Sequence, residues 1–151
     1  MSASSEPVVH VVDDDESVRR SFASLLEEVG LRVATFPSAE AFLQALRDDS
    51  RGCIVLDVRM PGMSGLQLQQ LLCERGVLMP TIIVTGHADV PMAVNAMSAG
   101  AAGFIEKPFN PQELLDRIHD CLATDARQAA FQAERRRATE LLDGLSGREL
   151  E

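Results

Sequence analysis

Short apolar runs alternate with stretches of helical periodicity along most of the chain. Five of these runs are almost continuously apolar or alternate only weakly, which is typical of strands that are buried on both faces of a parallel sheet. Each run is four to six residues long, which is too short for a buried helix. We therefore predict strands over residues 8–12, 31–36, 53–56, 81–85 and 103–106.

After each predicted strand, apolar residues recur at the three- and four-residue spacing of an amphipathic helix. Ser38 and Ser64 are suited to cap the N-termini of two of these helices, and Gly30 and Gly100 are suited to close two others. Residues 110–113 form a start signal that resembles a capping box, with proline at the first helical position. The expected helices are marked by Val18, Phe22, Leu25, Leu26 and Val29, by Phe42, Leu43 and Leu46, by Leu66, Leu68, Leu71 and Leu72, by residues 90–99, and by Leu114, Leu115, Ile118 and Leu122.

Strands that alternate with helices predict an α/β fold, in which a parallel five-stranded sheet is covered by helices on both faces. Ligands of such sheets bind beyond the carboxyl ends of the strands. The residues at those ends are chemically distinctive, because acids, a hydroxyl and an amine would meet at one edge. They are Asp13 and Asp14 after the first strand, Asp57 after the third, Thr85 at the end of the fourth and Lys107 after the fifth.

Composition narrows the class of protein further. The chain has 151 residues, lacks Trp and Tyr and carries a net charge of −9, so we expect one aliphatic core and no nonspecific binding to nucleic acid or to an anionic membrane. No apolar run is long enough to span a bilayer, and the first residues show no signal peptide, so we expect a cytoplasmic protein. The three widely spaced cysteines are interpreted as reduced thiols.

The last part of the chain differs in character from the rest. Residues 124–143 contain no Pro or Gly and are rich in Ala, Gln, Glu and Arg, which indicates an exposed helical linker. The basic run 135–137 is interpreted as a solvated helix face, with phosphate contact as the alternative. The expected organisation is a disordered tail over 1–6, a compact domain over 7–123, a helical linker over 124–144 and a separate start over 145–151.

Four motifs occur in order along the compact domain: VVDDD, IVLDVRMPGMSG, IIVTGHAD and GFIEKPF. Together they resemble the receiver domain of two-component response regulators, and residues 85–109 most resemble its FixJ-like subfamily. The resemblance implies a doubly wound, flavodoxin-like sheet of strand order 2-1-3-4-5 with a C-terminal helical linker. LSGRELE, residues 145–151, resembles the opening of a LuxR-type helix-turn-helix domain, of which only the start is present.

This resemblance implies a role for each residue at the strand ends. Asp57 would be the phosphorylation site, and Asp14, Asp57 and the backbone carbonyl of Arg59 would ligate Mg²⁺, with Asp13 acting through water. Lys107 would neutralise a phosphoryl oxygen. Such an ion would also offset the repulsion among the neighbouring carboxylates, since Mg²⁺ prefers oxygen ligands. Capping of the first helix explains Asp15 or Glu16 better than it explains the two acids before them.

Two further positions are implied to switch conformation. The Thr85 hydroxyl would bond to phosphorylated Asp57, and Phe104 would rotate into the space that Thr85 leaves; the alternatives are a structural Thr and a core Phe. The bond between Lys107 and Pro108 is expected to be cis. The implied partners are a sensor histidine kinase, a second copy of the chain on phosphorylation, and DNA only through the missing domain, with no membrane. Control of transcription would follow from that domain.

Other functions fit the sequence less well. A Mg²⁺-dependent phosphohydrolase with an aspartyl nucleophile would need a second Asp two residues after the first, where this chain has Arg59. A nucleotide-binding protein would need a glycine loop of the GxxxxGK[ST] type, which does not occur. A stand-alone interaction module that has lost phosphorylation is disfavoured by the intact set of strand-end residues. We therefore predict a regulator and not an enzyme.

Overall fold

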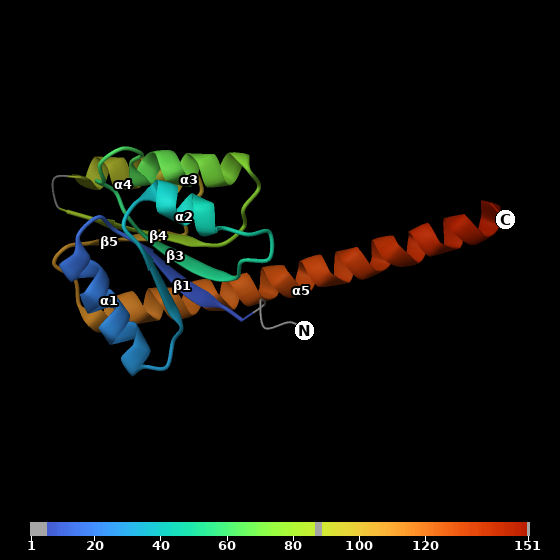
Figure 1. Cartoon of the computed structure of the whole chain (residues 1–151), viewed down its shortest axis with the longest axis horizontal. Coiled ribbons are helices and arrows are strands. Elements are labelled where there is room, and N and C mark those ends of the chain that lie inside the picture. The colour runs from blue at the N-terminus through green and yellow to red at the C-terminus, as the bar shows by residue number, and fades with distance from the viewer. Residues whose placement is uncertain (1–5, 87–88, 151) are drawn as a thin grey trace.

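The computed structural model describes residues 6–86 and 89–150 (Figure 1). Most of the predicted N-terminal tail, as well as His87, to which the sequence assigns no catalytic role, and Glu151 lie outside these ranges. The strands are β1 (Val8–Val12), β2 (Val33–Phe36), β3 (Gly52–Asp57), β4 (Thr81–Thr85) and β5 (Gly103–Glu106). The helices are α1 (Glu16–Glu28), α2 (Ala39–Ala45), α3 (Gly65–Glu74), α4 (Val90–Ser98) and α5 (Pro111–Leu150).

The five strands form one parallel sheet in the order β2-β1-β3-β4-β5, which confirms the predicted flavodoxin-like topology. Helices α2, α3 and α4 cover one face of the sheet, and α1 and α5 cover the other (Figure 1). Alternate residues of β3 serve the two faces: Ile54 and Leu56 belong to the core under α2–α4, whereas Cys53 and Val55 belong to the core on the α1 and α5 side. The central strands are buried on both faces because helices cover both, which explains their continuous apolar runs.

Local capping sets the ends of the helices. The side chains of Ser38 and Ser64 accept hydrogen bonds from backbone amides in the first turns of α2 and α3, as predicted. Three helices end on a glycine of positive φ, and in each the two amides after the C-cap bond back to carbonyls of the last turn, which is the Schellman motif. These glycines are Gly30, Gly76 and Gly100.

The long helix α5 answers a question that the sequence left open. It runs for 40 residues from Pro111 to Leu150, so the predicted linker helix continues α5 without a break (Figure 1). Its first part packs on the sheet, and the buried carboxylate of Asp125 pairs with Arg51 at 2.7 Å. Every residue from 134 to 143 is exposed. Of the helices in the described ranges, none combines the length and the apolar character that crossing a membrane requires.

Candidate functional site

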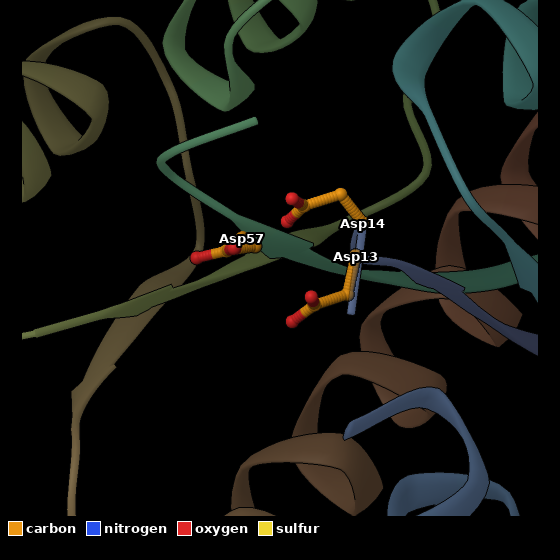
Figure 2. Close-up of side chains that lie close together, drawn as sticks. All are labelled: Asp13, Asp14 and Asp57. Atoms are coloured by element: carbon orange, nitrogen blue, oxygen red, sulfur yellow. The ribbon is translucent and has the colours of Figure 1, made fainter. Parts of the chain in front are cut away.

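Three carboxylates meet at the carboxyl ends of β1 and β3. Asp13 and Asp14 directly follow β1, and Asp57 is the last residue of β3. The two strands are neighbours, with Val12 paired to Leu56, so the next residues of both strands fall side by side. One oxygen of each carboxylate lies within 4.8 Å of the others. Figure 2 shows the three side chains extending from the two strand ends toward the same side.

The cluster is electrostatically unfavourable without a cation. Burial, and then the charge of Asp13, raise the pKa of Asp57 to about 6, although the Lys107 ammonium acts in the opposite direction. Burial also raises the pKa of Asp13, whose Oδ1 accepts a hydrogen bond from the Asp15 amide at 2.9 Å. Carboxylates that resist ionisation in this way are expected to gain from a nearby divalent ion, which favours the charged form.

The donor set fits a magnesium ion. It consists of carboxylate oxygens, which are the ligands that Mg²⁺ prefers, and Asp14 is exposed, so the cluster is open to solvent. Asp15 has a different task, because its Oδ1 accepts hydrogen bonds from Ser17 and Val18 and caps α1. Helix capping therefore accounts for Asp15, but it does not account for Asp13, Asp14 and Asp57.

Lys107 brings a positive charge to the same place. Its Nζ lies 4.0 Å from Oδ1 of Asp57, and the Asp57 side chain is 13% exposed. The backbone amide of Lys107 donates to the Thr85 carbonyl at 2.7 Å, which ties the end of β5 to the end of β4. The peptide bond to Pro108 is cis, as expected.

Comparison with known proteins shows the family of the chain. Residues 9–119 match the response regulator receiver domain family. The chain belongs to that family. Receiver domains generally bind Mg²⁺ at the acidic pocket, and this receiver holds the matching cluster of Asp13, Asp14 and Asp57.

The relatives place this receiver among FixJ-like regulators. The transcriptional regulatory protein FixJ of Azorhizobium caulinodans is 49% identical over 93% of the chain and 67% of its own length. The transcriptional regulatory protein TdiR of Thauera aromatica is 46% identical over 95% of the chain and 63% of its own length. The solved structure of the response regulator StyR has a TM-score of 0.89 at 44% identity and covers 95% of this chain and 73% of that chain. The chain spans about two thirds of the length of the curated relatives it matches.

The two predicted switch residues of this receiver lie on one face of the sheet. Thr85 is fully buried at the end of β4, and its hydroxyl donates to the Gly86 carbonyl at 3.1 Å. Phe104 of the edge strand β5 pairs with Ile83, two residues before Thr85, and packs half-buried against the core under α4. The structure therefore brings both residues together next to α4, while their switching roles remain predictions.

Sequence reasoning missed one strong contact of the receiver. The guanidinium of Arg59 forms a bidentate pair with the Asp89 carboxylate, with three nitrogen–oxygen distances of 2.7 to 2.8 Å. The sequence motifs assigned only the backbone carbonyl of Arg59 and gave Asp89 no role. A signal was available, because Arg59 and Asp89 shortly follow the neighbouring strands β3 and β4 and so belong to one edge of the sheet.

Proposed function

We propose that Asp57 accepts a phosphoryl group from a phosphohistidine of a sensor histidine kinase, and that the resulting conformational change is the output of this domain. The proposal is carried by one observation: Asp13, Asp14 and Asp57 form a single cluster, with the Lys107 ammonium 4.0 Å from the acceptor. Membership of the receiver family and likeness to transcriptional regulators support it.

The chemistry is one of positioning and charge neutralisation. The bond between phosphorus and the kinase imidazole breaks as a bond from phosphorus to an Asp57 oxygen forms, and the leaving imidazole takes up a proton from water. Lys107 would stabilise the negative charge on the phosphoryl oxygens as a point charge. Asp14, Asp57 and the Arg59 carbonyl would hold Mg²⁺, with Asp13 acting through water; the bound ion would supply charge neutralisation and orientation.

The switch would begin at Thr85. In this structure its hydroxyl is engaged with the Gly86 carbonyl, so bonding to a phosphoryl oxygen requires it to change partner. Phe104 on the same face would then turn inward and alter the surface that α4 and β5 form. Dimerisation through that surface would follow, and the change would reach a DNA-binding domain in a longer protein, since the curated relatives extend beyond the matched part. Phosphorylation can act this way only by biasing two conformations that already exist.

The proposal is tested by treating residues 1–151 with acetyl phosphate and Mg²⁺ and measuring the intact mass. We expect one added phosphoryl group on the wild type and on an Asp15→Asn control, in which Asn keeps the helix cap. Asp57→Asn and samples with excess chelator should gain none. Label that persists on Asp57→Asn would place the acceptor elsewhere, and steady release of phosphate from other esters would point to a hydrolase. A mass in solution that does not change with the phosphoryl mimic beryllofluoride would count against dimerisation.

A further inference from the structure

The ion pair between Arg59 and Asp89 joins the connection after β3 to the start of α4. Arg59 lies in the connection between β3 and α3, two residues after the acceptor, and Asp89 directly precedes α4. The Asp89 side chain is 11% exposed and the Arg59 side chain is 70% exposed, so the carboxylate is enclosed while the guanidinium lies at the rim. Bidentate pairs of this kind combine charge attraction with fixed geometry. The contact therefore holds the start of α4 against the connection that follows Asp57.

Asp89 occupies a helix N-cap position without acting as a cap. The equivalent side chains before α1, α2 and α3 all accept hydrogen bonds from amides of their own helix, whereas Asp89 makes no side-chain cap bond within the described residues. Pro91 has no N–H, so the Met92 amide is the natural capping donor in α4. The Asp89 carboxylate therefore bonds to Arg59 instead of capping α4. The Met92 amide is a second possible donor to this carboxylate if the Arg59 guanidinium moves away.

Arg59 also contacts the acceptor itself. Its backbone N–H is a hydrogen-bond partner of the Asp57 carboxylate, while its guanidinium is committed to Asp89. The charges that act on the acceptor come from Asp13, Lys107 and Asp14. Arg59 follows Asp57 by two residues, so its long side chain starts next to the acceptor. A phosphoryl group carries about −1.5 to −2 charge and three oxygens suited to a guanidinium, so it competes with the single charge of Asp89.

We propose that the Arg59–Asp89 pair is a latch for the unphosphorylated conformation, and that a phosphoryl group on Asp57 opens it by taking the Arg59 guanidinium. The released Asp89 carboxylate then caps α4 at Met92, so the start of α4 changes its hydrogen bonds when the acceptor is modified. This inference rests on the proposed function, because it requires a phosphoryl group at Asp57. It adds a positioning pair that links the acceptor to α4 independently of Thr85.

The test uses beryllofluoride with Mg²⁺ as the probe and amide NMR spectra of residues 1–151. The variants are Asp89→Asn, Arg59→Gln and the double variant, because Asn keeps a capping side chain before α4. The matched control is Arg32→Gln, which removes a surface ion pair with Glu6 of 2.8 Å at the far end of the sheet. Two readouts are recorded: the shifts of the Met92 and Ala93 amides without the probe, and the affinity for the probe.

The two single variants are expected to have similar amide shifts without the probe and different affinities for the probe. Without the probe, both move the Met92 and Ala93 shifts toward the loaded wild-type values, because either change opens the latch. Asp89→Asn binds the probe about fivefold or more tightly, since Arg59 is free to meet it. Arg59→Gln binds no more tightly than wild type, because the group that meets the probe is gone. The double variant resembles Arg59→Gln, since the two effects are not additive.

The outcomes separate this inference from the proposed function. A wild type that takes up no beryllofluoride in the presence of Mg²⁺ overturns both. Uptake by the wild type, together with variant shifts that match the Arg32→Gln control, overturns the latch alone. Equal tightening by Arg59→Gln and Asp89→Asn overturns the exchange of partners, because the guanidinium would then add nothing to the loaded state.

Discussion

Replacing Asp57 by Asn should stabilise the metal-free fold while abolishing phosphorylation. The Asp57 carboxylate is mostly buried, and its pKa is raised from 3.8 to about 6, with burial as the main cause and the Asp13 charge as the next. A raised carboxylate pKa means that the fold disfavours the ionised form. Asn imitates the shape of the protonated acid without its charge. The variant therefore removes a cost that the wild type carries at neutral pH.

The size of the effect can be worked from the shift. One pKa unit corresponds to about 1.4 kcal/mol, so ionised Asp57 destabilises the metal-free fold by up to about 3 kcal/mol at pH 7.5. Because the folded pKa lies above the unfolded one, this cost reaches its full size only well above pH 6 and disappears as the pH falls through the folded value toward the unfolded value of 3.8. The same relation gives a difference between variant and wild type of roughly 1.6 kcal/mol at pH 5 and about 0.6 kcal/mol at pH 4.

Urea unfolding in chelator at these three pH values measures the difference directly. Repeating the series with Mg²⁺ should narrow the gap at pH 7.5, because a bound ion stabilises the wild-type carboxylates more than it stabilises the variant. An Asp57→Asn variant that is no more stable than wild type at pH 7.5, or a gap that widens as the pH falls, would refute the reasoning about the cluster.

Three further changes test other parts of the site and of the fold. Lys107→Met should raise the acceptor pKa above about 6, since the ammonium lowers it, and a carboxyl carbon NMR titration with an unchanged midpoint would contradict this. Gly65→Ala should cost at least about 2 kcal/mol in urea unfolding, because its Cβ would lie 2.2 Å from the acceptor's carbonyl oxygen, whereas Gly86→Ala, with nothing within 4 Å, should cost little. Arg51→Gln should cost about 3 kcal/mol by leaving the Asp125 carboxylate buried without its cation, and a loss below about 1 kcal/mol would show that solvent reaches it.

Most of the fold was predictable because local signals agree with the topology. Continuous apolar runs marked the central strands, and the bounds of β1, β4 and β5 match those predicted. The strand expected from Leu31 begins instead at Val33, because the Leu31 amide bonds to the Leu26 carbonyl as part of the cap that ends α1. An apolar residue that belongs to a helix cap has the same pattern in the sequence as one that belongs to a strand.

The sequence predicts some residues of the site and not others. Asp13, Asp14, Asp57 and Lys107 come together because parallel strands end at one edge, and the motifs place them there. The pair between Arg59 and Asp89 depends instead on which way two long side chains turn after leaving their strands. No periodicity encodes that choice, and the motifs gave Asp89 no role.

The unbroken course of α5 has a mechanical consequence. A helix rises about 1.5 Å per residue, so the part of α5 after residue 133, which is exposed over residues 134–143, acts as a stiff arm about 25 Å long. A tilt of about 10° where α5 packs on the sheet would displace the tip of that arm by roughly 4 Å, against a helical pitch of about 5.4 Å. The unbroken helix also fixes the direction in which each residue of the arm faces. Inserting one residue would rotate the part of the helix that follows by about 100°, whereas inserting seven residues would nearly restore the original direction.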